Sequence, residues 1–350
     1  RKTAHTSDFQ PRSLATAAQL APDARWVLVS VPGRYAAAVA RQALELGRNV
    51  FLYSDNVSLE DEISLKRAAA AGGLLVMGPD CGTAIVNGVG LGFANSVRGG
   101  AIGLVGASGT GLQLVTARIH QLGGGITHAL GTGGRDLSEP VGAITALQAL
   151  DLLRRDAATH VIVLISKPPS PRVAEQLILA ARTTGKPVVI NFIGYRQTAD
   201  APDNVYFVHT LDAAAELAVE LAGLENGAAL EVTPPPFAPG QRWLRGIFSG
   251  GTLAYEAQLL LADYLPAVYS NAPLDKAYRL AQATESREHT IVDLGEDEFT
   301  VGRLHPMLDN DLRIKRIAQE ASDPAVAVLL LDVVLGHGAH PDPASELAPA

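Results

Sequence analysis

Two short glycine-rich turns in this chain carry residue types that can hold an anion. The first, Ser108-Gly109-Thr110-Gly111, follows the apolar run 101–106 and opens a helix-like stretch. The second, Ser249-Gly250-Gly251-Thr252, follows the run 244–248 and opens another. Where a strand ends in such a turn, the first N–H groups of the helix stay unpaired and add to the positive end of its dipole. The pair predicts two helix N-termini that hold one small anion such as phosphate.

A purely structural interpretation of the turns is also open. Ser and Thr cap helices and glycine permits tight turns, so one copy alone would need no ligand to explain it. The order of strand, small turn and helix is kept in both copies. This repetition favours a binding function.

Three side chains near expected strand ends are candidates for catalysis. Lys167 can neutralise a phosphate or carboxylate, with an ordinary solvated lysine as an equal alternative. Arg135 lies in a glycine turn where a planar guanidinium can hold an oxyanion, with a surface ion pair as the alternative. His305 follows the Gly/Asp turn 294–297 and can act as acid, base or substrate contact, with capping or packing as the alternative.

Five further positions are predicted to contact substrate: Asp80, Cys81, Asn95, Gly133 and Gly134. A packing role for Cys81 is favoured over a nucleophilic one, because no base is adjacent in the sequence. Asn95 follows a glycine-rich hairpin, and a turn role is its alternative. No group of His, Cys and Asp residues has the spacing of metal ligands, so no metal site is predicted.

Strand and helix patterns alternate along the chain after residue 24. Buried strands rich in β-branched residues, separated by helices, predict an α/β fold with mainly parallel sheets. The expected strands are 26–31, 49–53, 74–77, 102–105, 126–130, 160–165, 187–192, 205–208, 290–294 and 325–331. The expected helices include 35–46, 59–71, 112–122 and 211–222. Ligands of open α/β sheets bind at the carboxyl ends of the strands, where both turns lie.

The strands and helices fall into three consecutive units. The second and third each contain a strand, an SG(G)T turn, a helix and then a strand that ends in a Gly/Asp turn, as copies of one another would. Three consecutive prolines, 234–236, predict a linker between them. Residues 1–24 and the tail from residue 340 read as irregular, and we expect the chain to be a fragment of a longer protein or one half of a processed one.

Composition excludes several classes of function. The chain has 28 Lys and Arg against 36 Asp and Glu, a net charge of −8 without a basic block, which argues against nucleic acid as a partner. No apolar run approaches the roughly 20 residues of a membrane span, and no signal peptide is visible. Cys81 is the only cysteine, so no internal disulfide can form and a reducing cytoplasm is the expected location.

These motifs together resemble the FdrA family within the succinyl-CoA synthetase superfamily of acyl-CoA ligases, from about Trp26 onward. Residues 31–32, 56–59 and 77–82 resemble the CoA-binding domain of the ligase α-subunit. Residues 103–110 resemble the loop that opens its phosphate-binding helix, and 249–252 the matching helix of the β-subunit. The resemblance implies a Rossmann-like CoA-binding-type domain at 1–98 and two flavodoxin-like ligase-CoA-type domains at 99–230 and 241–350, the last incomplete.

Two departures from the ligases bear on the chemistry. Their strand equivalent to 187–190 leads into a long loop with a phosphorylated histidine, whereas residues 194–202 here form a short segment without one. Lys167 lies in the turn where the ligases place a glutamate near that histidine. We therefore expect no phosphohistidine relay, and a structural role for His209. Neither a CoA-holding glycine loop in residues 1–25 nor an ATP-grasp domain is recognisable in the sequence.

The resemblance implies a subunit of an oxamate carbamoyltransferase of purine (allantoin) breakdown. In this hypothesis the two turns hold the phosphate of carbamoyl phosphate, while Arg135, Lys167 or His305 stabilises developing charge. Two alternatives stay open: a subunit of an ADP-forming acyl-CoA synthetase, with CoA as a ligand, and an inactive assembly subunit that keeps an anion pocket. The expected partners are a small-molecule substrate and other subunits, in a homodimer or hetero-oligomer.

Overall fold

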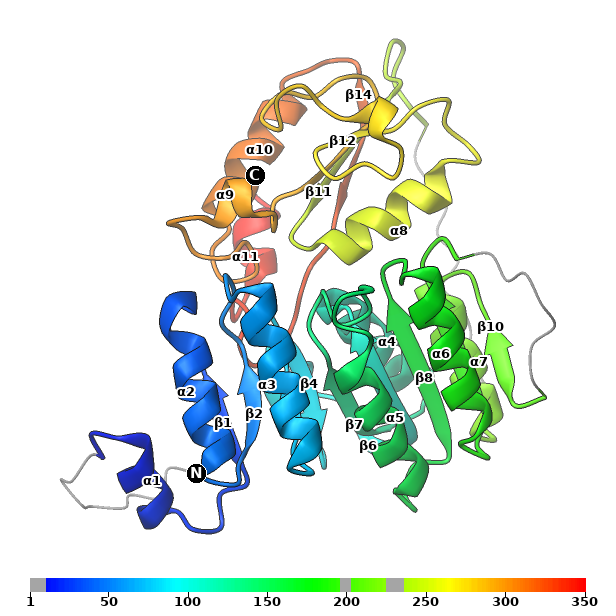
Figure 1. Cartoon of the computed structure of the whole chain (residues 1–350). Coiled ribbons are helices and arrows are strands. Elements are labelled where there is room, and N and C mark those ends of the chain that lie inside the picture. Colours follow the sequence, from blue (N-terminus) through cyan, green and yellow to red (C-terminus); the bar gives the residue numbers. More distant parts are fainter. Residues whose placement is uncertain (1–10, 196–202, 225–235) are drawn as a thin grey trace.

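The computed structural model describes residues 11–195, 203–224 and 236–350. They form three sheets in an α/β arrangement, and almost all strand pairs are parallel, which confirms the predicted fold class (Figure 1). A short helix, α1 (Leu14–Leu20), precedes the first strand in a region predicted as irregular. Most of the proline-rich linker and of the segment 194–202 lies outside the described residues.

The first sheet has three parallel strands in the order β1-β2-β3. Its strands are β1 (Trp26–Val29), β2 (Asn49–Leu52) and β3 (Val76–Met77). The helices α2 (Gly33–Glu45) and α3 (Leu59–Ala71) connect them and share one apolar core with the sheet. Ser58 caps α3 by accepting a hydrogen bond from the Asp61 N–H, which explains why the predicted start of this helix is correct.

The second sheet has seven strands in the order β10-β9-β8-β6-β7-β4-β5. Its parallel strands are β6 (Gly99–Ala107), β7 (Ile126–Gly131), β8 (Val161–Ser166), β9 (Val188–Phe192) and β10 (Val205–Phe207). The antiparallel hairpin of β4 (Thr83–Val86) and β5 (Val89–Gly92) extends its edge through β7. This hairpin precedes residue 98 in the sequence yet belongs to the second sheet.

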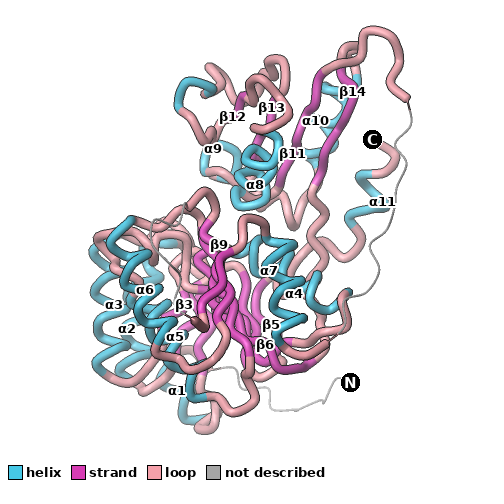
Figure 2. The backbone as a smooth tube through the Cα atoms, turned by 90° about the vertical axis from the view of Figure 1, so that its right-hand side faces the viewer, coloured by secondary structure: helices cyan, strands magenta, loops and turns pink. Residues whose placement is uncertain are grey.

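Helices cover both faces of the second sheet (Figure 2). One apolar core joins the sheet to α4 (Gly109–Gln121) and α7 (Leu211–Leu221). Another joins it to α5 (Ile144–Arg155) and α6 (Pro171–Arg182), and this core extends to Phe51 and Met77 of the first sheet. The first two sheets therefore share one continuous core.

The third sheet has four parallel strands in the order β12-β13-β11-β14. Its strands are β11 (Trp243–Phe248), β12 (Tyr269–Ser270), β13 (Thr290–Asp293) and β14 (Val326–Leu331). The helices of this unit are α8 (Gly251–Leu261), the 3-10 turn η1 (Lys276–Tyr278), α9 (Asp297–Thr300), α10 (Asp311–Ala321) and α11 (Pro343–Leu347). The helix α11 lies in the tail that the sequence predicted as irregular.

The second and third sheets repeat one arrangement at their centres. In each, the strand before the SG(G)T turn is central and lies between the next two long strands, giving β7-β6-β8 and β13-β11-β14. This supports the predicted similarity of the two units. The third unit lies over the carboxyl ends of the second sheet, and Glu256 of α8 accepts a hydrogen bond of 2.6 Å from the Leu211 N–H at the start of α7 (Figure 2).

Residues 333–340, here called the strap, lead from β14 back to the second unit. The His337 N–H donates to the Ala94 carbonyl at 3.0 Å, and the Asn95 amide donates to the Leu335 carbonyl at 2.7 Å. Val334 of the strap packs in a small apolar cluster with Phe93 and Met307. The strap thus fixes the third unit against the β4–β5 hairpin.

Candidate anion-binding site

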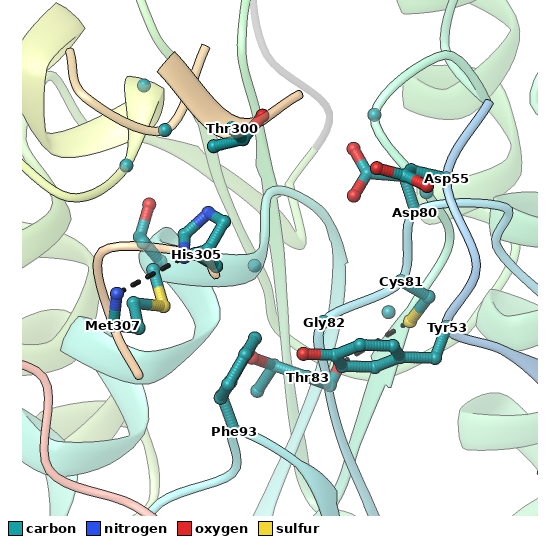
Figure 3. Close-up of a pocket in the computed structure, with 18 of the residues that line it drawn as sticks. Tyr53, Asp55, Asp80, Cys81, Gly82, Thr83, Phe93, Thr300, His305 and Met307 are labelled. Carbon is teal, nitrogen blue, oxygen red and sulfur yellow. Dashed lines mark hydrogen bonds between the residues drawn. The ribbon is translucent and has the colours of Figure 1, made fainter. Parts of the chain in front are cut away.

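A cavity of about 540 Å³ lies where the three units meet (Figure 3). It is bordered by residues at the carboxyl ends of strands from all three sheets, as expected for ligand sites in open α/β sheets. Most of the predicted site residues line it: Asp80, Cys81, Ser108, Gly109, Thr110, Gly133, Gly134, Lys167, Gly250, Gly251, Thr252 and His305. Gly111, Ser249, Asn95 and Arg135 do not line it.

The turn before α4 is capped by its own serine. Ser108 has an extended backbone, and its hydroxyl accepts a hydrogen bond of 3.0 Å from the Gly111 N–H. This satisfies one of the unpaired donors at the helix start. Ser108 and Thr110 are both buried, each 6% exposed, so the turn is fixed within the cavity wall.

The turn before α8 is built differently. Gly250 occupies the N-cap position and supplies no side-chain cap, so more of the first N–H groups of α8 remain unpaired. Ser249 points away from the cavity: its hydroxyl donates to Asp332 at 2.6 Å, and its N–H donates to the same carboxylate at 2.9 Å. Asp332 is in turn paired with buried Arg313 at 3.1 Å. The buried ion pair of Asp332 and Arg313 therefore fixes this turn on the side that faces away from the cavity.

The two turns touch one another across the second and third units. The Ser108 hydroxyl donates to the Thr252 hydroxyl at 2.7 Å, and a Cβ at Gly250 would overlap the Thr110 methyl group. The N-termini of α4 and α8 thus converge on the same part of the cavity. Two separately encoded helix starts contribute to one wall, as the repeated motif predicts.

A lysine and a carboxylate flank the first residue of α8. A Cβ at Gly251 would lie 2.8 Å from the Lys167 ammonium nitrogen and 2.7 Å from an Asp293 carboxylate oxygen. In the part of the chain that the structure describes, Lys167 makes no ion pair within 4 Å. Burial raises the pKa of Asp293 to about 7, against the opposing effect of the Gly295 N–H that it accepts. The charge of Lys167 is therefore available to a ligand at the α8 turn.

His305 is a neutral donor in this arrangement. Its Nδ1 accepts a hydrogen bond of 3.3 Å from the Met307 N–H, which leaves the proton of the neutral ring on Nε2. Burial lowers the pKa of His305, although the charge of Asp55 opposes this. Figure 3 shows the ring at the side of the cavity formed by Met307 and Thr300. An Nε2–H donor suits a ligand oxygen.

Arg135 is held in a buried ionic network rather than in the cavity wall. Its guanidinium donates to Glu62 at 2.9 Å and to the Val57 carbonyl at 2.8 Å. The fully buried Lys66 ammonium bridges Glu62 and Asp136 at 2.8 and 2.7 Å. These contacts give Arg135 the structural role that was its alternative, and they fix the turn that carries Gly133 and Gly134.

Asp80 and Cys81 follow the first sheet into the cavity. Burial, together with the nearby charge of Asp55, raises the pKa of Asp80 to about 6. Burial raises the pKa of the Cys81 thiol to about 12, so this side chain stays protonated and packs as the sequence suggests. Gly133 has φ +86° and approaches the Pro79 carbonyl so closely that any Cβ would overlap it.

Several cavity residues were missed from the sequence: Tyr53, Asp55, Thr83, Phe93, Gln113 and Asp293. Asp293 ends a strand and Asp55 follows one closely, a signal that could have found both. Thr83 and Gln113 carry no such signal, because their place depends on the hairpin and on the second turn of α4. Asn95, predicted to contact substrate, instead holds the strap.

Within residues 11–195, 203–224 and 236–350, no group of three or more His, Cys, Asp or Glu side chains is arranged to hold a metal ion. No helix in those ranges has the length and apolar character needed to cross a membrane.

Two protein families match parts of the chain. The CoA binding domain family matches residues 98–194, and the CoA-ligase family matches residues 247–350. The chain is also 45% identical over 340 residues to the uncharacterized protein YahF of Escherichia coli (strain K12), covering 95% of this chain and 66% of that protein. The chain belongs to the succinyl-CoA synthetase-like superfamily. This confirms the resemblance on which the sequence interpretation rests.

Two further relatives of this superfamily have assigned activities. The chain is 28% identical over 147 residues to the ADP-forming sulfoacetate-CoA ligase subunit SauD of Bilophila wadsworthia (strain 3_1_6), covering 40% of this chain and 49% of that protein. It is 27% identical over 168 residues to the malate–CoA ligase subunit alpha of Methylorubrum extorquens (strain ATCC 14718 / DSM 1338 / JCM 2805 / NCIMB 9133 / AM1), covering 46% and 54%. The chain spans about half to two thirds of the length of these three relatives.

Proposed function

We propose that the N-termini of α4 and α8 together hold a phosphoryl group in the cavity, at a site here called the cradle. The observation that carries this proposal is the 2.7 Å hydrogen bond between Ser108 and Thr252, which brings the two helix starts to one place. Unpaired N–H groups and the positive ends of two helix dipoles favour an anion there. Lys167 adds a full positive charge beside Gly251.

The class of reaction that we propose is acyl transfer by an acyl-CoA ligase-type subunit. The CoA-ligase match and the two named ligase relatives support this alternative better than carbamoyl transfer. In the proposed step, a phosphate oxygen attacks a thioester carbonyl and the C–S bond breaks, giving an acyl phosphate and a thiol. Lys167 and the two helix starts hold the charge of the phosphate, and the Nε2–H of His305 donates to a ligand oxygen.

Other parts of the proposed enzyme would come from partner subunits. Two relatives are named as subunits of ligases, so we propose that another subunit supplies the nucleotide site. The division into units at 1–98, 99–230 and 241–350 is part of the same proposal.

Coenzyme A is a candidate ligand because the CoA binding domain family matches residues 98–194. The wall next to the first sheet does not fit its diphosphate, since the carboxylates of Asp55 and Asp80 lie there without a paired cation among the described residues. We therefore assign no residue of that wall to coenzyme A.

A second candidate function is direct use of an acyl phosphate such as carbamoyl phosphate. Two features favour it: residues 194–202 contain no histidine, and the resemblance places Lys167 where the ligases carry a glutamate. Without a phosphohistidine, the phosphoryl group would enter and leave the cavity on the substrate itself. The inactive assembly subunit remains the alternative in which binding occurs without turnover.

The decisive variant is Lys167→Met in the purified full chain, with Lys315→Met on the exposed face of α10 as the matched control. Calorimetric titration with inorganic phosphate should show binding to the wild type and to Lys315→Met, and about tenfold weaker binding to Lys167→Met, since charge-assisted contacts are strong. Equal phosphate affinity in all three proteins would contradict the cradle.

Titration with coenzyme A and with carbamoyl phosphate then separates the two reactions. Binding of coenzyme A supports the ligase proposal. Binding of carbamoyl phosphate without coenzyme A supports direct acyl-phosphate chemistry. Turnover with partner subunits present would exclude the inactive alternative.

A further inference from the structure

Two buried polar atoms without a partner lie in the cavity wall beside the α4 turn. In the part of the chain that the structure describes, they are the hydroxyl of Thr83, 2% exposed, and the amide oxygen of Gln113, 4% exposed. Other buried atoms without partners lie outside the cavity lining. A buried polar group without a hydrogen bond costs free energy, so a pair of them in a cavity wall indicates a ligand that supplies the missing partners.

The orientation of the Gln113 amide follows from its other contact. Its nitrogen donates to the Phe93 carbonyl at 2.8 Å, and a carbonyl can only accept. The amide oxygen must therefore be the free atom. It is an acceptor without a donor, and its complement in a ligand is an N–H or O–H group.

Thr83 lies next to the proposed phosphoryl site. A Cβ at Gly109, the first residue of α4, would be 3.8 Å from the Thr83 hydroxyl oxygen. Figure 3 shows Thr83 between the rings of Tyr53 and Phe93, whose centroids are 5.4 Å apart. A group bound at this wall therefore lies on the α4 side of the proposed phosphoryl site.

Two carboxylates are among the charged groups of this cavity. Asp55 and Asp80 line the same cavity, and Figure 3 shows their carboxylates above Tyr53. Free amide, hydroxyl and carboxylate oxygens together favour a group with N–H donors. They disfavour a carboxylate, which would add a third negative charge and leave the Gln113 oxygen unpaired.

We propose that Thr83 and Gln113 form a subsite that selects a substrate whose group adjacent to the phosphoryl site carries N–H donors, an ammonium or a primary amide. The proposal rests on the phosphoryl cradle described above and deepens it by naming the substrate class. Thr83 and Gln113 are specificity-determining residues, because they contact the part of the substrate that does not react.

A series of stable phosphonates tests this subsite by calorimetry with the full chain. Aminomethylphosphonate carries an ammonium and phosphonoacetamide an amide, whereas ethylphosphonate carries a methyl and phosphonoacetate a carboxylate. Wild-type protein should bind at least one N–H-bearing member about tenfold more tightly than both ethylphosphonate and phosphonoacetate. Which of the two binds identifies the source of the N–H donors.

The variant Thr83→Val removes the free hydroxyl with little change in shape and, because the hydroxyl has no partner, with little effect on folding. It should reduce the tenfold preference to about threefold or less. Thr132→Val is the matched control: Thr132 is fully buried, its hydroxyl also lacks a partner, and it does not line the cavity. The control should keep the wild-type preference.

Three results would overturn the subsite and leave the proposed phosphoryl site standing. Equal binding of all four phosphonates would mean that ordered water, not a ligand, satisfies the two atoms. Tightest binding of phosphonoacetate would assign a carboxylate substrate instead. Equal loss of preference in Thr83→Val and Thr132→Val would show an indirect effect. If neither inorganic phosphate nor any phosphonate binds, the cradle itself fails and the subsite with it.

Discussion

The helix starts of α4 and α8 have nearly the same sequence but are built in different ways. At α4, Ser108 is the N-cap and satisfies one of the helix donors itself. At α8, the additional glycine moves Ser249 out of the cap position, and Gly250 takes its place without a side-chain cap. Ser249 serves instead as the attachment point for Asp332. One inserted residue thus replaces a turn that is capped by its own serine with a turn that has no side-chain cap. The second turn is fixed instead by the hydrogen bonds between Ser249 and Asp332.

This difference assigns different roles to the two turns. The α4 turn has fewer free donors and borders the polar wall of Thr83, so it suits the junction between phosphoryl group and substrate. The α8 turn has more free donors and borders the ammonium group of Lys167, so it suits the charged phosphoryl oxygens. Its other neighbour, Asp293, is compatible with them in the protonated form that its raised pKa of about 7 favours. A repeated motif here does not mean two equivalent binding sites.

The largest expected effect is on the free energy of unfolding, and it compares the residues that fix the two turns, Asp332 for α8 and Ser108 for α4. Asp332→Asn removes the charge that balances buried Arg313, 2% exposed, and weakens the hold on Ser249. We expect a loss of about 3 kcal/mol in the free energy of unfolding, because an unpaired buried charge is costly. Ser108→Ala removes a helix cap and the neutral hydrogen bond to Thr252, but leaves no buried charge unpaired, and should cost about 2 kcal/mol. Urea unfolding of both variants measures the difference, and equal losses would contradict the contrast between the turns.

The next largest effect is on phosphate affinity, and it compares substitutions at the first residues of α8 and α4. Gly251→Ala would place a methyl group against the Lys167 ammonium and Asp293, in the proposed position of the anion. We expect phosphate affinity to fall by about a hundredfold, roughly 2.7 kcal/mol. Gly109→Ala meets only the Thr83 hydroxyl, at 3.8 Å, and should change phosphate affinity by less than about threefold. A larger loss of phosphate affinity in Gly109→Ala than in Gly251→Ala would mean that the α4 turn, and not the α8 turn, holds the charged phosphoryl oxygens.

The smallest expected effect is the pH dependence of the folding stability that arises from Asp293, next to the start of α8. Its pKa rises from 3.8 to about 7 on folding, so the folded state binds this proton more tightly than the unfolded state. The resulting stabilisation is complete below about pH 4 and is lost as the pH rises through 7. The stability advantage of Asp293→Asn over the wild type should therefore be larger at pH 8 than at pH 5, by about 1–2 kcal/mol.

Thermal unfolding at the two pH values checks this prediction. Parallel stability curves for Asp293→Asn and the wild type between pH 5 and pH 8 would show that this carboxylate does not titrate in the range.

The pattern of strands and helices could be predicted from the sequence because it is local. Periodicity located nearly every long strand, and Ser58 marked the start of α3 correctly. The short elements β12, η1 and α9 were missed, since they have two to four residues and exist only where the third unit packs around them. The sheet to which β4 and β5 belong depends on pairing with β7, which no local pattern encodes.

The candidate site could be predicted only in part. The turns, Lys167 and His305 lie at strand ends, where topology alone puts them at the cavity. Arg135 has the right residue type in the right turn, but Glu62, 73 residues earlier in α3 of the first unit, accepts a hydrogen bond from its guanidinium. Thr83 and Gln113 could be recognised only in the folded structure, because the signal is a buried polar atom of each that has no hydrogen-bond partner.

The strap begins at the residue after Asp332, whose carboxylate binds Ser249 in the turn before α8. The position of the strap can therefore affect the geometry of the cradle. Undocking residues 333–340 from the β4–β5 hairpin would remove the hydrogen bonds at Ala94 and Leu335 and free the backbone next to the Asp332 carboxylate. That carboxylate holds the Ser249 N–H one residue before the α8 cap. The contact of the tail with the hairpin and the carboxylate that holds the α8 turn are thus neighbours in the chain, so we expect local opening of the strap to loosen the donors of α8 as well.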